Sequence, residues 1–116
     1  MASRTASLER QDGRVVCEHV LVAARPLERM RGLLGRSELP EGEGILLRPA
    51  GSIHTFFMRF AIDAVFLDRD LVVIGIEPSL GPWRTASRRG ARSVVELASG
   101  ECERRDIEVG DALAVA

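Results

Sequence analysis

Lysine is absent from this chain of 116 residues, and all 16 basic residues are arginine. With 17 acidic residues the formal net charge is -1, so no overall positive field favours nucleic acid or an anionic membrane as a partner. Long apolar runs are also missing: none approaches the roughly 20 residues that cross a bilayer, and the polar residues 1–13 do not form a signal peptide. We therefore expect a cytoplasmic protein that binds neither nucleic acid nor membrane.

Cysteine and histidine are scarce, with two residues of each. Cys17 and Cys102 lie far apart in the sequence, which is typical of two buried thiols in a reducing compartment. The residues that could serve as metal ligands are His19, His54, Asp63 and Glu96. Their spacing matches no HxH, HExxH or CxxC pattern, and no nucleophile elbow or phosphate loop occurs. We expect neither a metal nor another cofactor.

The stretch from Gly51 to Asp68 contains all four phenylalanines, together with one histidine, one arginine and one aspartate. Alternation along 52–60 predicts a strand that carries His54 and Arg59 on opposite faces. The stretch thus combines large apolar side chains, which are typical of a core, with polar side chains that would need partners there. It is therefore the most promising place for a site.

Strand patterns dominate the chain and do not alternate with helices as a parallel sheet requires. Residues 1–13 are predicted to be a flexible lead-in, and 14–116 a single β-rich domain. Two short helices are predicted, over 26–35 and 99–105, the second with Ser99 as its N-cap. The predicted strands are 14–23, 45–47, 52–60, 62–67, 71–76, 93–97 and 112–116. The fold class is thus mainly β: a small antiparallel barrel or a jelly-roll-like sandwich with two short helices.

Polar residues of the central stretch allow two interpretations each. Arg59 and Asp63 would form an internal salt bridge or a clamp for a carboxylate ligand, but on a straight strand they stand about 13 Å apart and need a bend to meet. His54 is either a rim histidine or an acid/base, with Asp63 or Glu96 as its acidic partner. Trp83, in the arginine-rich loop 78–92, is either a lid on the core or a stacking surface.

Three blocks of the sequence, RMRGLLGRSELPEGEGILL, SIHTFFMRFAIDAVFLD and VVELASGECERRDIEVGDAL, occur in an order that resembles the bacterial and archaeal family known as domain of unknown function 192. The resemblance extends from about Arg25 to Leu113 and implies a compact, mainly β domain with a barrel-like or jelly-roll-like core. It implies no activity and no catalytic residue.

The leading hypothesis is a ligand-binding or accessory domain, monomeric or weakly dimeric, for a small polar ligand such as an anion or a carbohydrate. Its predicted ligand-binding residues are His54, Thr55, Arg59, Asp63 and Trp83. One alternative is a hydrolase or lyase that uses His54 as acid/base with Asp63 or Glu96. Another is a protein-interaction module that binds an acidic partner through the loop from Arg84 to Arg92.

Overall fold

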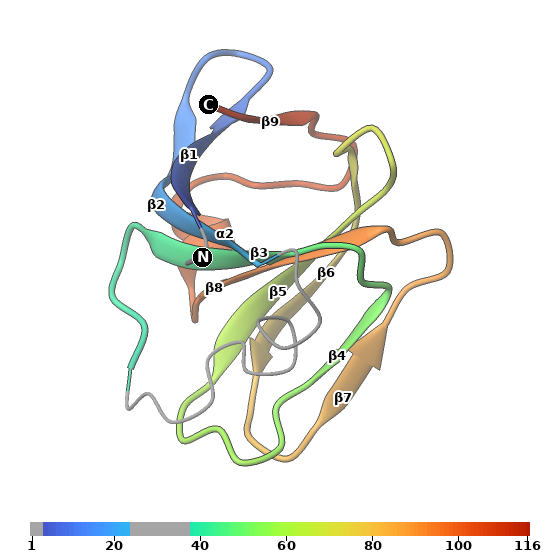
Figure 1. Ribbon diagram of the computed structural model, residues 1–116. Helices are drawn as coiled ribbons and strands as arrows, with labels where there is room; N and C mark the ends of the chain where they lie inside the picture. The colour runs from blue at the N-terminus through green and yellow to red at the C-terminus, as the bar shows by residue number, and fades with distance from the viewer. Residues whose placement is uncertain (1–3, 24–37) are drawn as a thin grey trace.

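The structure is a computed structural model that describes residues 4–23 and 38–116 (Figure 1). The helix found within these residues is the short α2, Glu101–Arg104. The strands are β1 (Arg4–Arg10), β2 (Val15–Ala23), β3 (Glu43–Leu47), β4 (Ser52–His54), β5 (Ile62–Leu67), β6 (Val73–Leu80), β7 (Thr85–Ser87), β8 (Ser93–Ala98) and β9 (Leu113–Val115). The predicted helix over 26–35 lies outside the described residues.

Seven of the strands form one sheet in the order β6-β5-β8-β3-β2-β1-β9, and β4 and β7 form a second, two-stranded sheet. All neighbours are antiparallel except β2 and β3, which pair in parallel. A parallel pair needs a long connection between its strands, and residues 24–42 supply it. The predicted mainly β class is confirmed.

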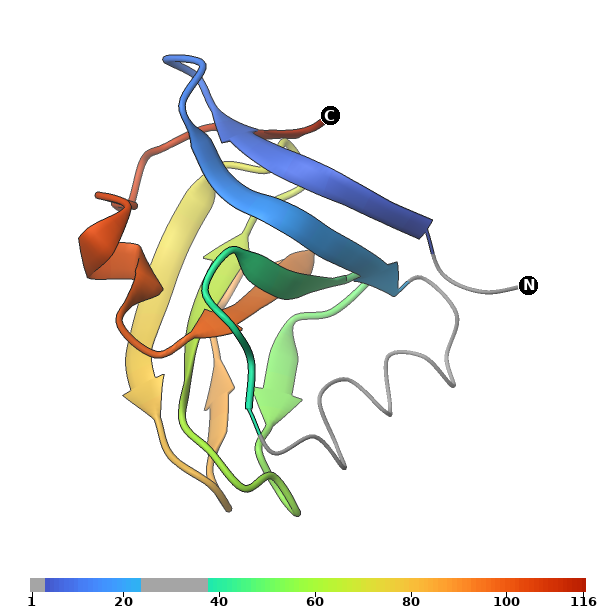
Figure 2. The same ribbon diagram turned by 90° about the vertical axis from the view of Figure 1, so that its left-hand side faces the viewer.

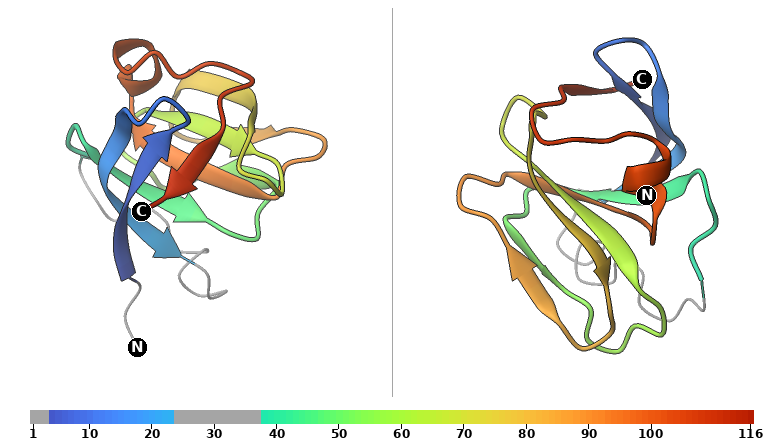
Figure 3. Two further views of the ribbon diagram at one scale, coloured as in Figure 1. Left: turned by 90° about the horizontal axis from the view of Figure 1, so that it is seen from above. Right: turned by 180° about the vertical axis from the view of Figure 1, so that it is seen from behind.

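The large sheet curls without closing into a barrel, as the views from above and behind show (Figure 3). Its edge strands β6 and β9 approach each other where Val72 and Ala112 form an isolated bridge. The two-stranded sheet lies against the lower part of the large one in Figure 1. The architecture is therefore closer to a sandwich than to a barrel.

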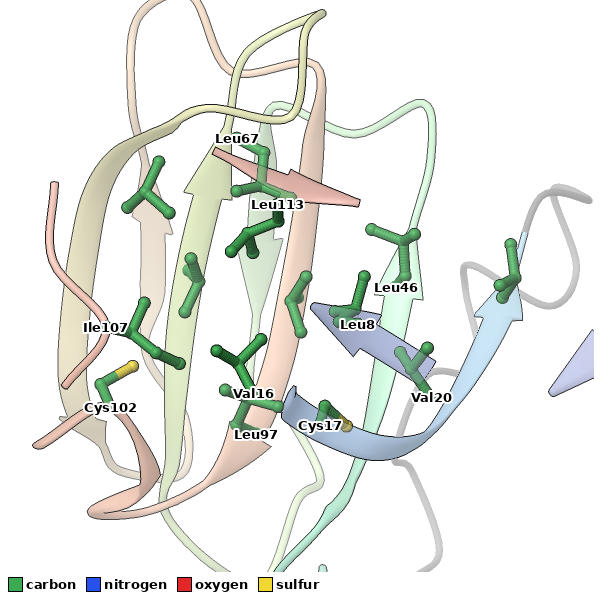
Figure 4. Packing of buried hydrophobic residues seen from close by; sticks show 14 residues of the cluster. Leu8, Val16, Cys17, Val20, Leu46, Leu67, Leu97, Cys102, Ile107 and Leu113 are labelled. Atoms are coloured by element: carbon green, nitrogen blue, oxygen red, sulfur yellow. The ribbon is translucent and has the colours of Figure 1, made fainter. Parts of the chain in front are cut away.

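Central strands of the large sheet are buried on both faces, so they read as continuous apolar runs. One face contributes Val65, Leu67 and Val95 to a cluster inside the curl (Figure 4). The other face contributes Phe66 and Val94 to a second cluster that includes residues of the small sheet and its flanking loops. The small sheet thus completes the second half of the core.

The prediction that residues 1–13 are a flexible lead-in is wrong, because β1 pairs with β2 on one side and with β9 on the other. Among the side chains of β1 whose burial is described, only Leu8 is buried. A strand with a single buried apolar residue has a weak sequence pattern. The segment forms a strand because it pairs with both β2 and β9.

The predicted strand over 52–60 is too long. β4 ends at His54, and Phe57 turns the chain with a left-handed φ of 68°. Met58 is buried, while Phe56 and Phe57 face outward. The turn breaks the alternation and prevents the four aromatic residues of this stretch from sharing one core.

Two element boundaries also differ from the prediction. β6 covers Val73–Leu80 and so continues through Pro78, whereas the predicted strand was 71–76. The residue before α2 is Gly100, with φ 93° and no side-chain cap, so Ser99 is not the N-cap. The Ser99 hydroxyl instead makes a 2.7 Å hydrogen bond with that of Ser79.

Candidate functional site

Four aromatic rings are in mutual contact where the loops after β4 and before β7 meet. We call this group, His54, Phe56, Phe57 and Trp83, the aromatic end. Ring centroids are 4.9 Å apart between His54 and Phe56, 5.8 Å between Phe56 and Trp83, and 4.7 Å between Phe57 and Trp83. The two loops reach the bottom of the molecule in both Figure 1 and Figure 2. The rings therefore form one continuous row.

Three members of this row are unusually exposed: Phe56 by 37%, Phe57 by 68% and Trp83 by 59%. Both Phe57 and Trp83 also have a left-handed backbone, with φ of 68° and 62°. Side chains with a Cβ rarely adopt this conformation, because it brings the Cβ against the neighbouring carbonyl. The protein thus maintains strained backbone at the two residues that expose the most aromatic surface.

Thr55, which is fully buried, holds the two loops together. Its hydroxyl donates to the Gly81 carbonyl at 2.6 Å and accepts from the Arg84 N–H at 2.9 Å. The Thr55 carbonyl accepts from the N–H groups of Trp83 and Met58, at 3.0 and 3.1 Å, and the Thr55 N–H donates to the Arg84 carbonyl at 2.8 Å. Thr55 therefore positions the aromatic end and is not itself accessible to a ligand.

His54 is exposed, and its Nδ1 accepts a 3.2 Å hydrogen bond from the Phe56 N–H. A neutral imidazole that accepts at Nδ1 carries its proton on Nε2. No carboxylate among the described residues hydrogen-bonds to His54, so the arrangement lacks the acid that orients a catalytic base. The geometry suits a donor to a ligand better than an acid/base.

Two arginines that adjoin the aromatic end have no ion-pair partner in the described part of the chain. Arg59 and Arg84 are exposed, and within 4–23 and 38–116 no carboxylate forms an ion pair with either. Arg88 differs, because its guanidinium lies 5.0 Å from the ring centroid of buried Phe66 and donates to Glu77 at 3.2 Å. Arg88 is thus a structural residue, whereas the other two remain available.

Asp63 does not pair with Arg59, so the predicted salt bridge is wrong. The carboxylate is 1% exposed and accepts three backbone N–H groups: Ser79 at 2.9 Å, Gly100 at 3.1 Å and Cys102 at 3.0 Å. These bonds tie the end of β6 to the turn before α2. Asp63 lies inside the protein with both oxygens in use, so it stabilises the fold and does not face a ligand.

Glu96, the remaining acidic candidate, lies in the middle of β8 and is 3% exposed. Its Cα neighbours across the sheet are Ile45 and Ala64, both of the second core cluster. Its Oε1 has no hydrogen-bond partner, and burial raises the pKa of its carboxyl to about 7. This group is separate from the aromatic end and has no contact with His54.

Both cysteines are buried free thiols of the first core cluster, on different elements (Figure 4). Burial raises the pKa of the Cys17 thiol to about 11, and burial together with nearby Asp63 raises that of Cys102 further. A raised pKa keeps a thiol protonated and unreactive. Neither cysteine is a candidate nucleophile.

Of the residues predicted for the site, the structure brings together His54, Thr55 and Trp83, while Arg59 is exposed in the loop that follows β4. Asp63 and Glu96 are internal, and His19 is exposed on β2. Phe56, Phe57 and Arg84 were not predicted as ligand-binding residues, although they surround the site. The sequence feature that could have indicated these residues is the group of phenylalanines around Arg59. The alternating pattern of residues 52–60 instead predicted a strand whose phenylalanines belong to the core.

Two further observations bear on the chemistry of the described part of the chain. It contains no group of three histidine, cysteine, aspartate or glutamate side chains that could hold a metal ion. None of the helices in it is both long enough and apolar enough to span a membrane.

Fold and site together define a class: a small, mainly β domain with an exposed aromatic surface. The chain belongs to the family of domain of unknown function 192, described as uncharacterised ACR, which it matches over residues 7–115. An archaeal UPF0127 protein from Thermococcus sibiricus is 29% identical over 109 residues, covering 90% of this chain and 70% of the relative. A UPF0127 protein of Pyrococcus furiosus is 41% identical over 63 residues, about half of each chain (53%).

Two solved structures share the fold. A proposed transcription regulator from Sinorhizobium meliloti superposes with a TM-score of 0.88 at 20% identity, covering 99% of this chain and 96% of the other. A protein of unknown function from Novosphingobium aromaticivorans gives a TM-score of 0.82 at 22% identity, covering 97% and 84%. At these identities the likeness concerns the fold alone.

Proposed function

We propose that the chain is a carbohydrate-binding domain and that the aromatic end is its binding surface. The observation that carries the proposal is the row of exposed rings on a backbone held by Thr55. The C–H bonds on one face of a sugar ring are attracted to the electron-rich face of an aromatic ring. Hydroxyl groups at the sugar's edge would meet the Nε2–H of His54 and the guanidinium of Arg84.

Rigidity supports this function. A binding surface that is already ordered loses less conformational freedom when the ligand arrives, so more of the contact free energy appears as affinity. Thr55 provides that order from a buried position, through hydrogen bonds to both loops. The proposal thus assigns contact to the rings and preorganisation to Thr55.

Catalysis by His54 has less support. The described residues offer it neither an orienting carboxylate nor a nucleophile within hydrogen-bond reach, and its Nδ1 is bonded to the Phe56 N–H. An interaction module formed by the whole loop from Arg84 to Arg92 is also less favoured. Its central arginine, Arg88, is engaged with Phe66 and Glu77.

Titration calorimetry with a panel of oligosaccharides tests the proposal on the wild type and on Trp83→Ala. Loss of one stacking ring is expected to weaken binding about tenfold or more, because an aromatic contact contributes beyond the area it buries. Val109→Ala is the matched control: Val109 is 64% exposed but lies outside the aromatic end, so affinity should not change. A panel without any binder, or equal affinities for wild type and Trp83→Ala, would refute the proposal.

The role of Thr55 is tested with Thr55→Val, which keeps the shape of the side chain and removes the hydroxyl. We expect a folded protein with weaker sugar binding, because the Gly81 carbonyl and the Arg84 N–H lose their partner. Thr55→Ser keeps the hydroxyl and should retain most of the affinity. Equal affinities for the valine and serine variants would show that preorganisation is not its role.

A further inference from the structure

We infer that the ligand of the aromatic end is an acidic oligosaccharide, one whose sugar rings carry uronate carboxylates. This inference rests on the proposed function and adds the charge of the ligand. Its basis is the local distribution of ionisable residues. Segments 50–62 and 78–92, which form the aromatic end and the small sheet, contain no aspartate or glutamate, although the chain has 17 acidic residues. They contain five arginines: Arg59, Arg84, Arg88, Arg89 and Arg92.

Two of these arginines adjoin the aromatic end in the sequence. Arg84 follows Trp83, and its backbone is fixed by two hydrogen bonds to Thr55. Arg59 follows Met58, whose N–H donates to the Thr55 carbonyl. Both guanidinium groups therefore extend from backbone that Thr55 holds in place, and both are exposed without a carboxylate partner in the described part of the chain.

The other arginines do not compete for this role. Arg88 is engaged with Phe66 and Glu77, as described above. Arg89 and Arg92 follow the far end of β7, where the Arg92 N–H donates to the Leu67 carbonyl at the end of β5. The exposed arginines that adjoin the rings in the sequence are thus Arg59 and Arg84.

An unpaired guanidinium beside an aromatic surface selects for a planar anion that it can bind through two parallel hydrogen bonds. A uronate supplies that anion on the same ring whose C–H face stacks on the aromatic row. Each sugar unit would then satisfy both features at once. A neutral sugar would leave the guanidinium groups without a partner.

Ring geometry favours a sugar over a nucleic-acid base. Successive centroids in the row are separated by 4.9, 5.8 and 4.7 Å, so neighbouring rings are packed against one another. A base inserted between two of them would have to open this packing. The row therefore has no slot between rings that could hold a base, and a sugar would have to contact it from outside.

Matched ligands test the inference directly. Oligogalacturonate, oligomannuronate and hyaluronate oligosaccharides are titrated against the wild type, each beside its methyl ester, which keeps the sugar and removes the charge. We expect at least one acidic form to bind about tenfold more tightly than its ester. Raising the NaCl concentration from about 50 to about 500 mM should weaken the acidic form and leave the ester nearly unchanged.

Arginine variants locate the effect. Arg84→Gln and Arg59→Gln should each reduce the preference for acid over ester, and the double variant should abolish it. Arg69→Gln is the matched control, because Arg69 is exposed in the hairpin at the opposite end of β5 and should leave the preference intact. Thermal unfolding checks that all variants are folded.

The outcomes separate the two proposals. Equal affinity for acid and ester, with both sensitive to Trp83→Ala, would overturn the inference and leave carbohydrate binding standing. Absence of binding to every sugar would overturn both. Tighter binding of single-stranded oligothymidylate or of phosphatidylserine vesicles, with the same dependence on Trp83 and Arg84, would also overturn the inference and assign the surface to nucleic acid or membrane.

Discussion

Around α2 several charged side chains form ion pairs, whereas the exposed arginines that adjoin the aromatic end have no such partner among the described residues. Glu101 is 1% exposed and accepts hydrogen bonds from the Gly42 N–H at 3.0 Å and from Arg104 at 2.8 Å. Arg105 lies 3.4 Å from the same carboxylate and 2.8 Å from that of Glu18. No such pairing exists for the arginines beside Trp83 among the described residues.

The two regions also differ in apolar surface, which is buried next to α2 and exposed at the aromatic end. Ile107 and Cys102, next to α2, are buried in the first core cluster. Three of the six large apolar side chains that are exposed in the described residues belong to the aromatic end, while Val15, Leu21 and Val109 are the others. The region around α2 uses its polar and apolar groups inside the protein, whereas the aromatic end exposes them to solvent. Mutations should therefore affect stability at one end and binding at the other.

The largest effect is expected at the paired end, for Asp63→Ala. Three buried N–H groups would lose a charged acceptor, and each unsatisfied group costs roughly 1–3 kcal/mol. We expect the free energy of unfolding to fall by about 4 kcal/mol. Urea denaturation measures it.

Asp70→Ala is the control for this change, because Asp70 is exposed at the hairpin tip and should alter stability by less than about 0.5 kcal/mol. Similar losses for the two variants would mean that the buried carboxylate has no special role.

Glu96 sharpens the comparison, because it is a buried carboxylate without the partners that Asp63 and Glu101 have. Its pKa in the folded state is about 7, raised from 4.5 by burial, so the folded protein binds the proton more tightly than the unfolded chain. Stability should therefore fall as the pH rises from about 4.5 to about 7 and then level off. The full loss corresponds to about 3 kcal/mol.

Glu96→Gln stays neutral at every pH and should remove this dependence. Unfolding by urea at about pH 4.5 and about pH 9 is the measurement: the variant should resemble the wild type at the lower pH and be more stable at the higher one. Glu103→Gln, an exposed residue of α2, serves as control. Parallel pH profiles for the wild type and Glu96→Gln would contradict the expectation.

Much of the fold could be predicted from the sequence, because core strands carry local signals. The continuous apolar pattern of β5 and β8 predicted both strands. The hairpin tip after β5 also rests on local contacts, because the Asp68 side chain accepts hydrogen bonds from the N–H groups of Asp70 and Val72. Such signals are contained in a few neighbouring residues, so no knowledge of distant contacts is needed.

The candidate site was harder to predict because distant contacts create it. Nothing in the local sequence indicates a left-handed Phe57 or Trp83, since both lie in loops that Thr55 joins across the fold. Likewise the partners of Asp63 are backbone N–H groups 16 to 39 residues away, which have no sequence signature. A salt bridge with Arg59 was the natural expectation from side chains alone.

The smallest expected effect is the difference in stability between two substitutions of Phe57. Its sign tests whether the backbone at Phe57 is strained. At an ordinary position glycine destabilises a protein relative to alanine, but at φ 68° the alanine Cβ is strained and the glycine is not. Phe57→Gly should therefore be more stable than Phe57→Ala by about 1 kcal/mol, while both lose the ring contact with Trp83 and bind sugar more weakly. Thermal unfolding and calorimetric titration of the pair measure the two effects. Such a result would mean that the strained backbone serves binding at the expense of stability, as strain at functional sites often does. If alanine were the more stable of the two, the loop would relax easily and the aromatic end would not be the preorganised surface that sugar binding requires.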